Sequence, residues 1–183
     1  RRVTIRGITC RNTPFWNTHI VYSDEATIED VTFRSPADSP NTDGLNIDSS
    51  SNVHIRGCFF DVGDDCIGLK SGSGPDGLRV GRPTENVTIT NCTMKSGHGG
   101  VVIGSETAGG VRNVSVSNCT FDGTDRGIRI KSRRGRGGTV EALVFSGISM
   151  RRVIVPLVIN LFYRCGSTEE DRGLFVDEEL PLN

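Results

Sequence analysis

A short apolar pattern recurs six times along the sequence, and this repeat constrains the fold more than any other feature. Each copy has an apolar residue, a second one two positions later, and an apolar residue or cysteine three positions after that. The last two of these positions are Ile5/Ile8, Ile28/Val31, Ile55/Cys58, Ile89/Cys92, Val116/Cys119 and Phe145/Ile148. The copies follow one another at intervals of about 28 residues, a period typical of solenoids.

A second alternating segment follows each of the later copies, as in residues 45–47, 67–69 and 101–103. Alternation with a period of two is typical of strands that bury one face. Each unit is too thin to bury that face unless it stacks on its neighbours, so we predict an all-β fold, a right-handed parallel β-helix of about six turns. No leucine-rich frame is kept, and we expect no helix between the strands. The insertions at 71–82 and 132–138 are expected to be loops on one side of the rod.

Composition and charge support this class and exclude others. Val and Ile account for 32 residues, against 15 for Leu, Met and Ala together, a balance that favours strands and excludes a helical bundle. The net charge of −1 predicts no strong attraction to nucleic acid or to an anionic membrane. No apolar run is long enough for a transmembrane helix, and the N-terminus lacks the pattern of a signal peptide. We expect one domain over residues 1–183, acting as a monomer.

Cysteine and asparagine recur at fixed places in the repeat. The register places Cys58, Cys92 and Cys119 at one inward site of three successive turns, where we expect buried free thiols, with disulfides along the stack as the alternative. Four asparagines satisfy the N-glycosylation pattern and also fall at recurrent turn and strand-edge positions. We interpret them as structural residues rather than glycan acceptors: Asn86, Asn91, Asn113 and Asn118.

Chemically reactive side chains collect at the start of the second alternating strand. We count positions from the first inward residue of this strand in each turn. Asp43 and Asp65 stand two positions before it, and Asp64 and His98 three positions before it. Arg129 and Lys131 stand one and three positions after it. Strands of a sheet lie about 4.8 Å apart, so we expect these groups to face one cleft. Strict alternation would bury Asp43 and Asp65, but Gly44 and Gly63 indicate an irregular strand start.

Four ordered motifs carry a resemblance to a known family. Asn41-Thr42-Asp43-Gly44, Gly63-Asp64-Asp65-Cys66, Gly97-His98-Gly99 and Arg129-Ile130-Lys131 resemble the signature motifs of glycoside hydrolase family 28, the polygalacturonases. The resemblance covers essentially the whole chain. It implies hydrolysis of α-1,4-galacturonosyl linkages in pectin with inversion at the sugar. The stretches 99–106 and 109–114 resemble the bacterial, exo-acting members more than the fungal, endo-acting ones.

The resemblance also implies roles for individual residues. Asp64 would be the general acid, and Asp43 and Asp65 would hold and deprotonate the attacking water, with His98 beside Asp64. Crowding of three carboxyl groups should raise the pKa of one of them, and the sequence alone does not assign which.

The remaining site residues would bind substrate. We expect Arg129 to grip a uronate carboxylate bidentately, and Lys131 to add a point charge. Asn41 is a predicted polar contact, and Tyr163 is predicted to border the cleft, although the sequence around Tyr163 departs from the family pattern. No cofactor or metal is expected.

Two further expectations concern loops and cysteines. The arginine-rich segment 132–138 follows Lys131 and is either a solvated loop or a positive rim that attracts the polymer. In fungal relatives the cysteine after the aspartate pair is disulfide-bonded, but the matching partner position here is Met94. The resemblance therefore implies no such bridge for Cys66.

Alternative functions stay open at this stage. They are a rhamnogalacturonan hydrolase of the same family, a calcium-dependent pectate lyase, and a non-catalytic carbohydrate-binding solenoid. We expect a secreted or periplasmic protein whose partner is an anionic polysaccharide. We also expect the sequence to be the catalytic middle of a longer rod that lacks both end caps, because solenoids need capped ends.

Overall fold

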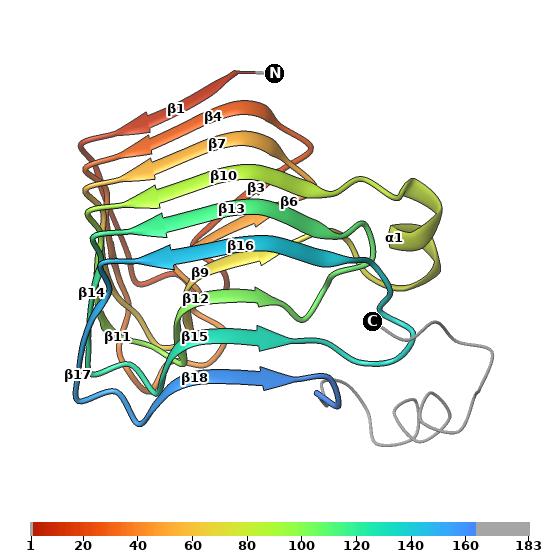
Figure 1. Cartoon of the computed structure of the whole chain (residues 1–183). Coiled ribbons are helices and arrows are strands. Elements are labelled where there is room, and N and C mark those ends of the chain that lie inside the picture. The colour runs from red at the N-terminus through yellow and green to blue at the C-terminus, as the bar shows by residue number, and fades with distance from the viewer. Residues whose placement is uncertain (1, 164–183) are drawn as a thin grey trace.

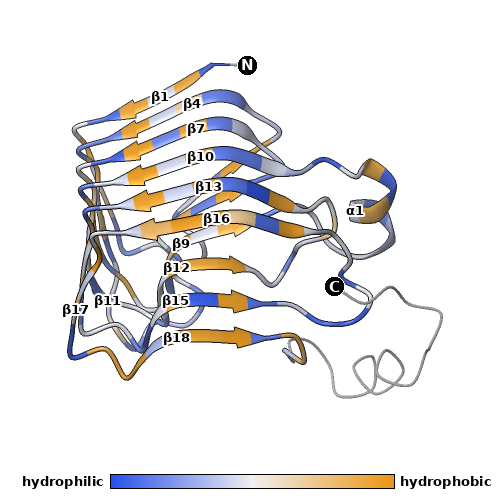
Figure 2. Ribbon diagram, in the orientation of Figure 1, coloured by the Kyte–Doolittle hydropathy of each residue, from blue (hydrophilic) through white to orange (hydrophobic). Residues whose placement is uncertain are grey.

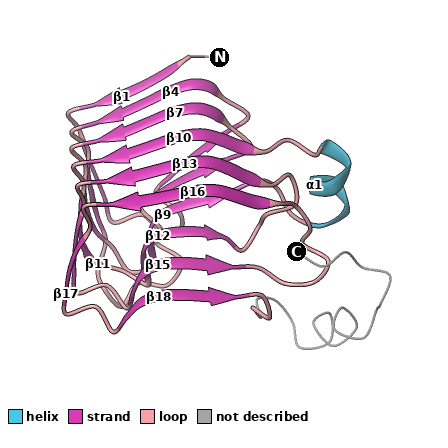
Figure 3. Cartoon of the chain, in the orientation of Figure 1, coloured by secondary structure: helices cyan, strands magenta, loops and turns pink. Residues whose placement is uncertain are grey.

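The chain winds as a parallel β-helix whose successive turns pair edge to edge. A computed structural model describes residues 2–163, and in it three parallel six-stranded sheets run along the helix (Figure 1). Most turns contribute one strand to each sheet, and nearly all of the backbone is strand or the turns that connect strands (Figure 3). The predicted fold class is confirmed.

We call the three sheets A, B and C. Sheet A contains β1 (Val3–Arg6), β4 (Asp24–Glu29), β7 (Ser51–Arg56), β10 (Thr84–Thr90), β13 (Val111–Ser117) and β16 (Val140–Ser146). Sheet B contains β2 (Thr9–Arg11), β5 (Thr32–Arg34), β8 (Phe59–Asp61), β11 (Thr93–Ser96), β14 (Thr120–Asp122) and β17 (Ser149–Arg151). Sheet C contains β3 (Thr18–Val21), β6 (Leu45–Asp48), β9 (Asp65–Lys70), β12 (Gly99–Gly104), β15 (Arg126–Lys131) and β18 (Val155–Asn160).

The strand register agrees with the repeat. In sheet A the second apolar residues of the six copies pair in a continuous row, Ile5, Ile28, Ile55, Ile89, Val116 and Phe145. In sheet C the corresponding row is Leu45, Ile67, Val101, Ile128 and Leu157. The alternation fixes this register because a slip by one residue would turn every apolar side chain outward.

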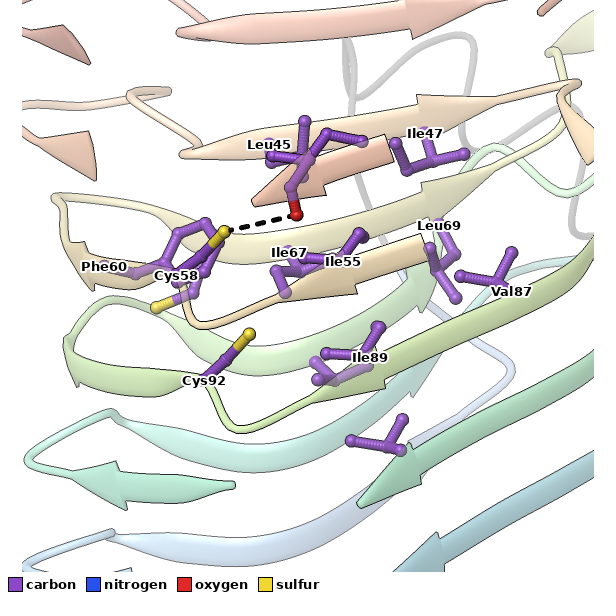
Figure 4. Close-up of a cluster of buried hydrophobic side chains, with 14 of the residues drawn as sticks. Leu45, Ile47, Ile55, Cys58, Phe60, Ile67, Leu69, Val87, Ile89 and Cys92 are labelled. Atoms are coloured by element: carbon purple, nitrogen blue, oxygen red, sulfur yellow. Dashed lines mark hydrogen bonds between the residues drawn. The ribbon is translucent and has the colours of Figure 1, made fainter. Parts of the chain in front are cut away.

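The core fills the space inside the three sheets. Apolar side chains of the middle turns are fully buried, and Figure 4 shows Cys58 and Cys92 among them. The predicted thiol ladder is confirmed, since Cys58, Cys92 and Cys119 are each 1% exposed and all are free. The last described strand of sheet C differs, because Leu157 is 58% exposed and Ile159 61% exposed. This strand appears as an orange band in the hydropathy view (Figure 2).

An asparagine ladder bends the strands of sheet A. Asn52, Asn86 and Asn113 have φ values of 57°, 56° and 55°, in the left-handed region that asparagine tolerates better than most residues. The Nδ2 atom of Asn113 donates to Asn86 Oδ1 at 3.2 Å, and that of Asn86 donates to Asn52 Oδ1 at 3.1 Å. Asn86 and Asn113 thus have a structural role in this ladder.

One expectation about the insertions was wrong. The insertion at 71–82 contains a short helix, α1 (Gly74–Val80), which Pro75 starts and which Gly81 ends at a left-handed φ of 57°. The sequence pattern missed it because the segment is short and rich in glycine. Among the described residues, α1 is too short and too polar to cross a membrane.

Candidate active site

The predicted residues converge on one cleft over sheet C. All eight line it, namely Asn41, Asp43, Asp64, Asp65, His98, Arg129, Lys131 and Tyr163. The cleft has a volume of about 180 Å³. These residues come from several successive turns of the helix, which parallel strand pairing brings together.

The floor of the cleft holds two aspartates. Asp43 is 3% exposed and Asp65 1% exposed, and the backbone N–H of Gly44 donates to the carbonyl of Asp65 at 3.0 Å. A Cβ at Gly44 would lie 2.6 Å from the Phe60 ring and 2.7 Å from the carbonyl of Cys66, so only glycine permits this approach. The irregular strand start that the glycines indicated places both carboxyl groups beneath the cleft.

Asp65 is held by the two cations of β15. Lys131 Nζ donates to Asp65 Oδ2 at 2.7 Å, and Arg129 Nη1 lies 3.5 Å from Asp65 Oδ1. Both cations face the ring of Tyr163, with centroid distances of 5.2 Å for Arg129 Cζ and 5.0 Å for Lys131 Nζ. The expected point charge of Lys131 is therefore already paired with Asp65.

The surroundings of Asp43 favour its protonated form. Burial, together with the negative charge of Asp65, raises the pKa of Asp43 to about 7. The Lys70 ammonium and a hydrogen bond from Asn46 Nδ2 at 2.9 Å oppose this rise without cancelling it. Burial and the neighbouring carboxylate of Asp65 thus raise the pKa of one of the three crowded carboxyl groups, that of Asp43.

Asp64 and His98 form a pair at the side of the cleft. His98 Nδ1 lies 3.5 Å from Asp64 Oδ1. Burial acts to raise the pKa of Asp64, but the hydrogen bond and charge of His98 outweigh it and lower that pKa. The hydrogen bond to Asp64 raises the pKa of His98. In the ligand-free cleft the proton of this pair therefore resides on the imidazole, not on the carboxyl group that the resemblance implies as the acid.

Five cleft residues were missed by the sequence reasoning: Trp16, Lys70, Ser105, Glu106 and Arg126. A signal existed for three of them. Trp16 and Arg126 stand two positions before the first inward residues Thr18 and Ile128, as Asp43 and Asp65 do before theirs. Lys70 stands three positions after Ile67, as Lys131 does after Ile128.

In the same cleft the buried Lys70 pairs with the half-buried Glu106. Lys70 Nζ donates to Glu106 Oε2 at 2.8 Å and to the carbonyl of Gly104 at 3.2 Å. The same ammonium lies 4.6 Å from the centroid of the Trp16 ring. Burial acts to raise the pKa of Glu106, but the charges of Lys70 and Arg136 and the hydrogen bond from Lys70 lower it to about 2.

Two arginines of the segment 132–138 are buried rather than solvated or exposed on a rim. Arg133 is 9% exposed and Arg136 8% exposed. Arg136 Nη1 donates to Glu106 Oε1 at 3.0 Å and to the Ser73 hydroxyl at 3.3 Å, which ties this segment to the insertion containing α1. Its charge is used inside the protein, so the rim hypothesis is wrong for Arg136.

The cysteine expectation from the resemblance agrees with the structure. Cys66 is buried and free, and its Sγ donates to the carbonyl of Ser96 at 3.1 Å. Met94 is fully buried on β11. Among the residues that the structure describes, no group of three or more His, Cys, Asp or Glu side chains is arranged to hold a metal ion.

Comparison with known proteins follows this geometry. A family model described as "Glycosyl hydrolases family 28" matches residues 1–172. A "Probable polygalacturonase" of Vitis vinifera is 39% identical over 150 residues, covering 81% of this chain and 30% of that protein. The polygalacturonase structure from Erwinia carotovora ssp. carotovora matches with a TM-score of 0.82 and 32% identity, over 89% of this chain and 41% of the other.

A second solved structure is also similar. The hyperthermoactive exopolygalacturonase from Thermotoga maritima matches with a TM-score of 0.76 and 34% identity, over 87% of this chain and 36% of that chain. The chain thus spans between 30% and 41% of the length of these relatives. Because the family model matches nearly all of the sequence, the chain belongs to glycosyl hydrolases family 28.

Proposed function

We propose that this chain carries the catalytic site of a polygalacturonase, which hydrolyses α-1,4-galacturonosyl linkages of pectin with inversion. The observation that carries the proposal is the placement of three carboxyl groups, Asp43, Asp64 and Asp65, in one cleft with Arg129 beside them. Glycoside hydrolysis needs one group that protonates the leaving oxygen and another that deprotonates the attacking water. The similarity to polygalacturonases supplies the substrate class.

The charges of the cleft favour a uronate over a neutral sugar. Four carboxyl groups and four Lys or Arg side chains line it. A proton retained on Asp43 and another on His98 leave the cleft with a net positive charge, which an anionic sugar would balance. Arg129 offers a planar guanidinium stacked on Tyr163, the geometry that binds a carboxylate bidentately.

We assign the proton transfers as follows. The pair of Asp64 and His98 holds one proton, and Asp64 passes it to the glycosidic oxygen as the bond to C1 breaks. Water attacks C1 from the opposite face, and its proton goes to the carboxylate of Asp65, while Asp43 orients the water. An anionic sugar above Asp64 excludes water and adds negative charge, and both effects raise the pKa of that carboxyl group toward the value an acid catalyst needs.

The test compares the protein with its Asp64→Asn variant. We expect saturated products with inverted anomeric configuration, followed by proton NMR on trigalacturonate, and a loss of turnover of at least 1,000-fold in the variant, in line with the loss of a general acid. Asp76→Asn on the exposed face of α1 is the matched control and should keep full activity.

Other outcomes identify the alternatives. An unsaturated, ultraviolet-absorbing product that EDTA abolishes would indicate a lyase. Binding of oligogalacturonate without turnover in the unmodified chain would indicate a carbohydrate-binding solenoid. Cleavage of rhamnogalacturonan in preference to polygalacturonate would indicate a rhamnogalacturonan hydrolase of the same family. Each of these results contradicts the proposal.

Exo action remains a prediction, supported by the stretches 99–106 and 109–114. Sizing the products of a defined oligogalacturonate over time tests it, because an exo enzyme releases monomers or dimers from the outset. Mixed lengths would contradict it. Since polymeric pectin is too large to enter a cell, we also propose that the protein acts outside the cytoplasm, in secreted or periplasmic form.

A further inference from the structure

An acidic residue outside the predicted site stands directly in line with Asp64 and His98. Asp64, His98 and Asp125 each occupy the third position before the first inward residue of a sheet C strand, on three consecutive turns. Backbone bonds hold this row: the N–H of His98 donates to the carbonyl of Asp64 at 3.1 Å, and the N–H of Asp125 donates to the carbonyl of Gly97 at 2.9 Å. The imidazole therefore lies between two carboxylates.

Each ring nitrogen of His98 faces one of these carboxylates. Nδ1 lies 3.5 Å from Asp64 Oδ1, and Nε2 lies 3.9 Å from Asp125 Oδ2. A neutral imidazole has a single N–H and would turn a lone pair toward one of the two acids. Only the doubly protonated ring offers a positive N–H to both, so this placement favours the imidazolium.

Other charges around His98 act on the same balance. The hydrogen bond and charge of Asp64 raise the pKa of His98, burial opposes this rise, and the charges of Asp125 and of Asp65 on β9 add to it. Arg126 Nη1 lies 3.4 Å from the same oxygen of Asp125 and weakens the effect of that acid. The side chains of His98 and Asp125 are 50% and 41% exposed, so solvent screens their interaction.

We propose that Asp125 is a positioning residue that holds His98 as an imidazolium beside Asp64. Asp125 does not touch the reacting atoms. It keeps on His98 the proton that Asp64 delivers to the leaving oxygen, and this role rests on the proposed hydrolysis. The column of Asp64, His98 and Asp125 is thus a proton-holding unit built from three turns.

The test is an NMR titration of the His98 ring in the full chain, which needs no turnover. Asp125→Asn should lower the midpoint of His98 by about half a pH unit, the size expected for one screened charge at this distance. Asp125→Glu should restore most of it. Asp76→Asn, which also removes an aspartate paired with an arginine, should leave the midpoint unchanged.

A second variant covers the case in which Asp125→Asn fails to fold. Asp125→Ser is that second variant, and it should lower the His98 midpoint by a similar amount because it removes the same negative charge. In an active protein, Asp125→Asn should also move the alkaline limb of kcat/KM to lower pH by the same amount. An unchanged His98 midpoint in whichever of Asp125→Asn and Asp125→Ser folds would overturn the proposal. If the His98 midpoint shifts as expected but the protein hydrolyses no substrate, only the proposed function is overturned.

Discussion

At the scale of the residue, a buried carboxyl group of the cleft lowers the stability of the folded protein. Asp43 is buried among other acids, so its ionisation in the folded protein is unfavourable. Its presence was predictable from the motif, but its high pKa was not, because that depends on the distance to Asp65 and on burial. The tight packing of Gly44 against Phe60 sets both.

Asp43→Asn should stabilise the protein at alkaline pH while abolishing turnover. The folded pKa of about 7 lies above the ordinary 3.8, so the wild-type protein loses stability as the pH rises from about 4 to 7. The amide cannot ionise and still accepts the bond from Asn46. We expect a gain in unfolding free energy of about 2 kcal/mol at pH 8 and almost none at pH 4. Urea unfolding at both pH values measures it, and an equal gain at both would contradict the argument.

Arg129→Lys tests whether the planar guanidinium recognises substrate. The variant keeps the positive charge beside Asp65 but loses the bidentate geometry and the stacking on Tyr163. We expect KM for trigalacturonate to rise about tenfold with kcat changed less than threefold. Arg79→Lys on α1 serves as the control. A fall in kcat alone, at constant KM, would indicate that Arg129 acts in the chemical step instead.

At the scale of the element, the strands were predictable and the insertions were not. Alternation specifies the faces of β9, β12 and β15, so their pairing register followed from the sequence. The insertions at 71–82 and 132–138 have no periodic pattern. Their structure depends on Glu106, which lies between Lys70 and Arg136, and no local rule predicts a contact between such distant segments.

Glu106→Gln should therefore loosen both insertions at once. The variant removes the negative charge paired with the buried ammonium of Lys70, a change that costs about 3 kcal/mol at neutral pH. Because the folded pKa of about 2 lies below the ordinary 4.5, the carboxylate's contribution is present at neutral pH and is lost as the pH falls through about 4.5 to 2. The variant and the wild-type protein should thus converge in stability near pH 2.

Hydrogen exchange and urea unfolding at pH 7 and pH 3 measure this effect. Faster exchange in Glu106→Gln should be confined to 71–82 and 132–138. Glu85→Gln, which breaks an exposed pair with Arg112 on sheet A, is the control. A uniform increase in exchange across all sheets would show that Glu106 supports the whole helix rather than its insertions.

At the scale of the whole molecule, each turn is stabilised by the turns on either side. Ile67 and Leu157 occupy the same row of sheet C, yet Ile67 is fully buried and Leu157 is 58% exposed. The contribution of a residue to the free energy of unfolding therefore depends on the number of turns that cover it as well as on its place in the repeat.

Substituting alanine at these two matched positions measures that dependence. Ile67→Ala should lower the unfolding free energy by about 4 kcal/mol, because it leaves a cavity between two covered turns. Leu157→Ala should lower it by less than about 1 kcal/mol. Urea unfolding provides both values. Equal losses would mean that Leu157 is covered in solution.

The side-chain contacts of the cleft run across the turns rather than along the chain. Asp64 meets His98, and His98 meets Asp125, only because parallel strands lie about 4.8 Å apart with their residues in step. One additional turn inserted between β9 and β12 would double the spacing between the turns that carry Asp64 and His98 while leaving every motif intact. Activity therefore depends on the number of turns between the motifs as well as on the motifs themselves. Duplicating one turn between β9 and β12 would abolish activity even if the rest of the fold were preserved.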